Sequence, residues 1–220
     1  MEARGGERSP GLQRDQARTR LARAAVVAAA GTLFLERGYG ATTIDAISEL
    51  AGVPTATVYR LFSSKHGILK SLLDVSIAGD DEDVPMADRP QVRSLLGEHD
   101  PRQQLAGFVR NAAHVNGRVA SLYRILVSAA GTDPDAAALL DELTRQRQQG
   151  QRVIARSFAR AGALRPGVRE RDAADLVHAL MSPELYRLLV VDRGWKTERY
   201  ERWLEGVLAD QLLPPAPVGS

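Results

Sequence analysis

The 220-residue sequence contains no cysteine, and this absence excludes disulfide bonds and thiolate metal sites. Aromatic residues make up only 5%, and three lysines leave almost all of the basic side chains to arginine. No apolar run approaches the roughly 20 residues that a membrane-spanning helix needs. Residues 1–20 carry charge without an apolar stretch, unlike a secretory signal. We therefore expect a cytoplasmic protein with no membrane partner.

The sequence also lacks the usual patterns of an enzyme. It has no glycine-rich phosphate loop and no supported Ser-His-Asp arrangement, and its four histidines are scattered without metal-ligand spacing. The acidic stretch "GDDEDVPMADRP" (79–90) lacks the ligand spacing and the glycine of a calcium loop. His114 and His178 could meet in an enzyme site, but two satisfied histidines of a helical core are the better interpretation. We predict no catalytic residue, no metal and no cofactor.

Charge is unevenly distributed along the chain. Residues 1–70 hold ten Lys/Arg against six Asp/Glu, a net charge of +4, whereas residues 71–220 hold nineteen against twenty-one, a net charge of −2. Such a division suits a polyanion-binding head joined to a mildly acidic body.

The first third of the chain has the spacing of four helices. Residues 15–37 repeat apolar side chains every four positions. Thr43 stands where the N-cap of a short second helix belongs, and Gly52 follows that helix. After a Val-Pro turn, a third helix is predicted from Pro54 or Thr55 to about Leu61, and a fourth over 65–78.

Only helical patterns follow, and no stretch alternates with period two, so the predicted fold is all-α. Helices are expected from Pro101, around 119–127, from Asp133-Pro134 to about Gly162, over 171–191 with a break at Pro183, and from Thr197 to Leu212. The predicted domains are a flexible arm (1–14), a first helical domain with its connecting helix (15–78), an acidic linker (79–90) and a second helical domain (91–220).

The stretch "AGVPTATVYRLFSSK" (51–65) has the character of a helix-turn-helix. Its second helix must be narrow to enter a major groove about 12 Å wide, and it needs an apolar back and flanking phosphate donors. Small residues for base reading are Thr55, Ala56 and Thr57. Apolar residues for the back are Val58, Leu61 and Phe62. Donors for phosphate are Tyr59 and Lys65.

The segment "FLERGYGATTIDAISELAGVPTATVYRLFSSKHGIL" (34–69) resembles the N-terminal domain of the TetR family of bacterial transcriptional regulators. The resemblance implies a three-helix DNA-binding head, a homodimer, a palindromic operator and an unknown small-molecule effector that releases a repressor. It also implies that Arg20, Thr43, Tyr59 and Lys65 contact DNA phosphates. The pair His66-Gly67 departs from the family pattern and predicts a helix start that frays.

The same resemblance implies an effector pocket and a dimer interface in the second half. Candidate pocket residues are Phe108, Asn111, His114, Tyr123, Leu126, Phe158, His178, Met181 and Tyr186, although apolar residues at helical spacing are more often core. Candidate interface residues are Leu185, Leu188, Leu189, Tyr200, Trp203, Leu204, Val207 and Leu208. The alternative function is a dimeric DNA-binding protein with the same head and no effector.

Overall fold

The computed structural model describes residues 10–80 and 88–215, and within these ranges every regular element is a helix. The predicted all-α fold is thus confirmed. The chain divides into two compact units, Met1–Leu72 and Leu73–Ser220. The division falls inside helix α4 (Lys65–Ala78), whereas the sequence suggested the acidic stretch 79–90. Residues 1–9 of the predicted arm and 81–87 of the predicted linker lie outside the described ranges.

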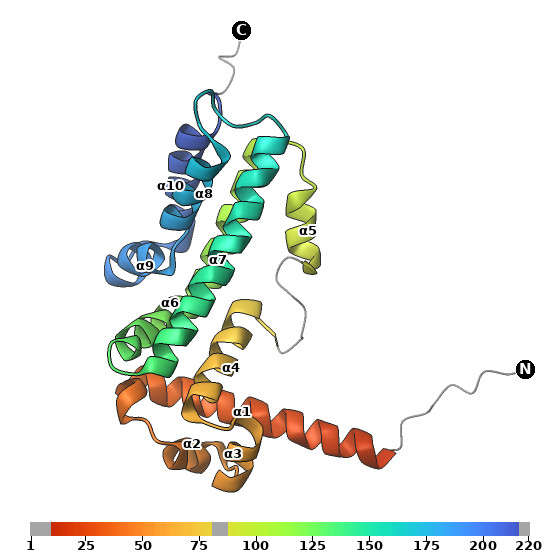
Figure 1. Cartoon of the computed structure of the whole chain (residues 1–220), viewed down its shortest axis with the longest axis vertical. Helices are drawn as coiled ribbons and strands as arrows, with labels where there is room; N and C mark the ends of the chain where they lie inside the picture. Colours follow the sequence, from red (N-terminus) through yellow and green to blue (C-terminus); the bar gives the residue numbers. More distant parts are fainter. Residues whose placement is uncertain (1–9, 81–87, 216–220) are drawn as a thin grey trace, which may run out of the picture. The chain divides into compact units, whose positions relative to one another are not determined.

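Unit 1 consists of α1 (Pro10–Ala41), α2 (Ile44–Ala51), α3 (Thr55–Phe62) and the first part of α4 (Figure 1). Helix α1 begins five residues before the predicted start at residue 15, and it is broken at Gly38, whose φ is 78°. Aliphatic and aromatic side chains with no exposed surface fill the space between the helices; they include Val26, Phe34, Ile47, Val58 and Leu69. The helix spacing read from the sequence therefore corresponds to one shared core.

The ends of α2 are set by the two residues that the sequence indicated. Thr43 is the N-cap, and its Oγ1 accepts a hydrogen bond from the Ala46 amide at 3.1 Å. Gly52 ends the helix in the left-handed conformation (φ 63°), which a glycine adopts without a steric penalty. Both predictions are confirmed, and together they fix the length of the first helix of the helix-turn-helix.

Unit 2 holds two long helices that run side by side, α6 (Pro101–Ala130) and α7 (Pro134–Arg160) (Figure 1). The sequence predicted two helices where α6 is continuous. In the middle of this helix the buried Asn116 donates to the Met181 carbonyl at 3.2 Å, and a Cβ at Gly117 would lie 3.2 Å from the Tyr186 hydroxyl. Asp100 and Asp133 cap α6 and α7 through their carboxylates.

The remaining helices of unit 2 are shorter. They are α5 (Pro90–Leu96), which the sequence analysis did not predict, α8 (Glu170–Leu180), α9 (Pro183–Tyr186) with the π-helical segment η2 (Arg187–Asp192), and α10 (Thr197–Leu212). The predicted break at Pro183 is confirmed, and the Ser182 hydroxyl accepts from the Leu185 amide at 3.2 Å. Thr197 is the first residue of α10 rather than its cap.

Gly67 allows α4 to begin directly beside the end of α3. A Cβ atom at this position would lie 2.1 Å from the Phe62 carbonyl oxygen, a backbone atom that cannot move aside alone. The predicted fraying is not seen, since the Gly67 amide donates to the Ser64 hydroxyl at 3.1 Å and α4 starts at Lys65. The residue that departs from the family pattern is therefore required by close backbone approach.

We expect Gly67→Ala to lower the free energy of unfolding by about 1–3 kcal/mol, because the added methyl must displace backbone. Gly40→Ala is the matched control within unit 1, since apart from its chain neighbours and its own helix backbone nothing lies within 4 Å of its Cβ position. Urea unfolding followed by circular dichroism measures both variants. Equal stabilities of the two variants would show that the α3–α4 junction relaxes without cost.

Candidate nucleic-acid interface

The turn between α2 and α3 is fixed by a chain of side-chain hydrogen bonds. The buried Ser48 hydroxyl donates to the Val53 carbonyl at 2.6 Å. The Thr55 hydroxyl lies 3.0 Å from Ser48 Oγ and 3.2 Å from Asp45 Oδ1, and it donates to one of these two acceptors. Thr55, predicted to read bases, thus also joins α3 to α2. Its single proton is occupied inside the domain.

Lys65 connects the start of α4 to the end of α1. Its ammonium donates to the carbonyl oxygens of Tyr39 at 2.8 Å and Thr42 at 3.0 Å, and it lies 4.3 Å from the centre of the Tyr39 ring. The buried Thr42 hydroxyl is within reach of the Gly38 carbonyl at 2.8 Å. The residue predicted as a phosphate donor is therefore a structural cation of the free domain.

Arg23, which the sequence analysis did not single out, holds the other end of α3. Its Nη1 donates to the Leu61 carbonyl at 2.8 Å, and its guanidinium lies 4.6 Å from the centre of the Phe62 ring. A cation at the C-terminal end of a helix offsets the partial negative charge of the unpaired carbonyls. Only the tertiary structure could reveal this role, because 38 residues separate the two partners.

The other predicted DNA contacts lie on the surface of unit 1. Tyr59 is 50% exposed, and Arg20, Thr43 and Ala56 are exposed as well, whereas Thr57 is half-buried. Thr43 accepts a hydrogen bond as the N-cap of α2, and its hydroxyl proton remains able to donate to a phosphate oxygen. The exposed side of α3 carries one further side chain, Arg60, which the sequence analysis did not assign.

Comparison with known proteins identifies this arrangement. Residues 26–72 match the model of the family described as bacterial regulatory proteins, tetR family. These residues form a DNA-binding domain of the TetR family. The match covers α2, α3 and the adjoining parts of α1 and α4, and it identifies the chain as a DNA-binding transcriptional regulator.

Relatives of this TetR-family regulator extend over both units. The HTH-type transcriptional regulator YdeS of Bacillus subtilis is 26% identical over 167 residues, which cover 76% of this chain and 77% of YdeS. NalD of Pseudomonas aeruginosa, the secondary repressor of the MexAB-OprM multidrug efflux pump, has the same fold, with a TM-score of 0.67 at 22% identity over 89% of this chain and 98% of NalD. A putative transcriptional regulator of Saccharomonospora viridis, solved in complex with choline, has a TM-score of 0.65 at 20% identity. The comparison covers 88% of this chain and 98% of that one.

The structure distributes the predicted pocket residues of the regulator over several environments. Four of them, Phe108, Phe158, Met181 and Tyr186, pack in one buried apolar cluster of unit 2. Tyr123 and Leu126 are buried elsewhere on α6, Asn111 is half-buried, and His114 is exposed. The predicted pairing of Asn111 with His114 therefore points partly to solvent.

His178 belongs to a polar network between α7 and α8. Arg147 Nη2 lies 3.1 Å from His178 Nε2, and His178 Nδ1 lies 2.6 Å from Gln151 Oε1. Because a guanidinium only donates, Nε2 accepts and the imidazole proton resides on Nδ1. Burial and the nearby Arg147 lower the pKa of His178, so the ring is neutral at pH 7. Within this network the buried Arg147 Nε has no hydrogen-bond partner among the described residues.

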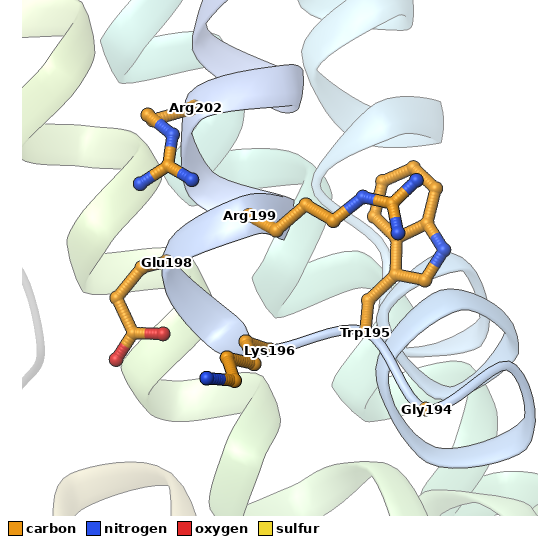
Figure 2. Close-up of a pocket in the computed structure, with 6 residues that line it drawn as sticks. All are labelled: Gly194, Trp195, Lys196, Glu198, Arg199 and Arg202. Atoms are coloured by element: carbon orange, nitrogen blue, oxygen red, sulfur yellow. The ribbon is translucent and has the colours of Figure 1, made fainter.

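A hollow of about 450 Å³ lies at the N-terminal end of α10 (Figure 2). Its lining residues are Gly194, Trp195, Lys196, Glu198, Arg199 and Arg202, and none of them was predicted to hold an effector. The Arg199 guanidinium covers the Trp195 ring at 3.9 Å from its centre, as Figure 2 shows. Three of its lining residues, Lys196, Arg199 and Arg202, are cations, so this hollow is not an apolar effector chamber.

The predicted dimer residues separate into two groups. Tyr200, Leu204 and Leu208 have no exposed surface within a single chain, so the structure assigns them to the core of unit 2 rather than to an interface. Their stripe packs on α6 and α8, which is the reason for this correction. The residues that a second copy could reach are Leu185, Leu188, Leu189, Trp203 and Val207.

Two properties of the described ranges bear on other functions. Within residues 10–80 and 88–215, no helix is both long and apolar enough to cross a membrane. In the same part of the chain, no three His, Asp or Glu side chains gather in a way that could hold a metal ion.

We expect Lys65→Met to lower the free energy of unfolding of the DNA-free regulator by about 1–3 kcal/mol, because two carbonyl acceptors lose a charged donor. Tyr59→Phe, at an exposed hydroxyl, should change it by less than about 0.5 kcal/mol. Chemical unfolding without DNA measures both. A Lys65→Met variant as stable as the parent protein would remove the structural role inferred for the ammonium.

Proposed function

We propose that this regulator is a cytoplasmic homodimeric repressor that leaves a palindromic operator when a small molecule binds in unit 2. Two identical heads related by a twofold axis read two inverted half-sites, which gives the operator its symmetry. The repressor NalD and the choline-bound regulator of S. viridis, both of the same fold, support the two parts of this proposal.

The observation that carries the proposal is the continuous helix α4, which belongs to unit 1 up to Leu72 and to unit 2 from Leu73. At its C-terminal end, Arg118 of α6 donates from Nε to the Ser76 carbonyl at 2.7 Å and from Nη2 to the Ile77 carbonyl at 2.9 Å. A movement of α6 therefore pulls directly on the helix that begins at Lys65.

The residues after α4 strengthen this attachment. Gly79 has a φ of 88°, and the Arg118 guanidinium lies 3.3–3.6 Å from where its Cβ would be. Arg89, 5% exposed, makes two hydrogen bonds to the Asp80 carboxylate at 2.6 and 2.8 Å. Burial, and the charge of Arg89 after it, lower the pKa of Arg118. The C-terminal end of α4 is thus held by Arg118, and the residues directly after it are held by the Arg89–Asp80 pair.

For the effector, the proposal is a site at the buried cluster around Tyr186 and Tyr200. The Tyr200 hydroxyl is buried and has no hydrogen-bond partner among the described residues. Such groups are normally satisfied by water or by a ligand. An effector with an apolar body and one polar group could pair with this hydroxyl, and its entry would shift α10 against α6, its packing partner.

For the dimer, the proposal is a face on η2 and the adjoining helices. Leu188 and Val191 of η2 are 47% and 55% exposed, and the half-buried Leu185, Leu189 and Trp203 accompany them. Exposed apolar side chains grouped on one segment are typical of a surface that a partner covers.

Selection of bound duplexes from a random library at ~150 mM salt tests the proposal, because non-specific binding is weak at this ionic strength. We expect an enriched inverted repeat and, in an operator-release assay with a small-molecule panel that includes choline, at least one compound that lowers affinity. An inverted repeat without any such compound would favour the effector-independent DNA-binding protein. The absence of an enriched sequence would contradict the repressor.

We expect Arg118→Met to increase amide exchange in residues 73–80 at least tenfold, since two charge-assisted hydrogen bonds to the end of α4 are lost. Operator affinity should fall severalfold in the same variant. Arg124→Met, at an exposed arginine of the same helix, is the matched control. Unchanged exchange and affinity in Arg118→Met would refute the coupling route through this side chain.

A further inference from the structure

Arg60 occupies the middle of the exposed side of α3. Val58 and Phe62 are the buried residues of this helix. At 100° per residue, Arg60 points about 180° from the mean direction of these two side chains. Ala56 lies about 40° and Thr57 about 60° from Arg60 on the same helical projection. The side chain opposite the core is therefore the arginine, not one of the predicted small residues.

The neighbours of Arg60 leave its guanidinium accessible. Ala56, one turn earlier, is exposed and contributes only a methyl group, so the helix can approach a groove closely at this point. Among the described residues, no hydrogen bond or ion pair occupies the Arg60 guanidinium. The C-terminal end of α3 already has a cation in Arg23, which donates to the Leu61 carbonyl. The Arg60 guanidinium is therefore not needed to stabilise the end of α3, and it can contact DNA.

The predicted base readers are chemically weaker on this face. The Thr55 proton is held by Ser48 or Asp45, Thr57 is half-buried, and Ala56 has no polar atom. In the major groove, guanine presents two acceptors, O6 and N7, at a spacing that matches the two parallel N–H donors of a guanidinium. Arg60 is the side chain of α3 that can make this paired contact.

We propose that Arg60 determines operator specificity by reading one guanine in each half-site. The inference rests on the sequence-specific DNA binding proposed above, and it adds the residue and the base. Tyr59 and Thr43, beside this face, fix the backbone through phosphate contacts, while Arg60 reads the base edge.

The test compares operators selected by the parent protein with those selected by Arg60 variants. The parent protein should select an inverted repeat with a fixed guanine, preferred by roughly 5-fold to 150-fold over other bases, the range for one bidentate pair. Arg60→Ala should keep the repeat and lose that preference. Arg60→Gln should shift it toward adenine, whose N6 and N7 match a carboxamide.

Arg152→Ala is the matched control, since it removes one exposed helical arginine from unit 2 and should leave the selected sequence unchanged. Thermal unfolding confirms that the Arg60 variants remain folded. The same guanine preference in Arg60→Ala would overturn the proposal. The proposal would also be overturned if Arg60→Ala weakened binding equally on all sequences and reduced the slope of log affinity against log salt concentration by about 1. That result identifies a phosphate contact. If the parent protein selects no operator, the proposed function fails. If it selects an operator and Arg60→Ala keeps the guanine preference, only the role of Arg60 fails.

Discussion

The contact on which the DNA-binding unit depends is the Lys65 ammonium between two carbonyl oxygens of the α1–α2 junction. These oxygens belong to Tyr39 and Thr42, at 2.8 and 3.0 Å, and they follow the break in α1 at Gly38. The same residue starts α4, directly after the turn that Gly67 keeps tight. One charged group thus fixes the position of α4 against α1. Helix α3 joins the α2 turn to the tight turn at Gly67.

Helix α4 then carries that constraint out of unit 1. It is helical from Lys65 to Ala78, and the carbonyls of Ser76 and Ile77 near its end accept from Arg118 of α6. A helix fixed by a cation at its first residue and by another at its last turn transmits rotation better than a loop, because its internal hydrogen bonds resist bending. This is the physical basis for proposing that events in the helical body reach the recognition helix.

Local rules predicted the elements of the fold well, since caps and turns depend on near neighbours. The cap at Thr43, the helix end at Gly52 and the break at Pro183 were assigned correctly because they depend on residues a few positions away. The contact of Asn116 with Met181 was not predicted, because 65 positions separate the two residues. Tyr200, Leu204 and Leu208 were placed in the dimer interface for a similar reason, since their spacing is that of any apolar face and only packing shows which surface covers them. Periodicity identifies a buried side and leaves the partner undetermined.

The basic residues show why composition alone overstates a DNA-binding surface. Of the cations in unit 1, Lys65 and Arg23 donate to backbone carbonyls at helix ends. Arg118 does the same in unit 2. Their charges still add to the field that attracts a polyanion, because that field depends on position and not on hydrogen bonding. Sequence reading needs donors that are unoccupied and directed outward, and on α3 this condition selects Arg60. Attraction to DNA and choice of sequence are therefore assigned to different members of one basic set.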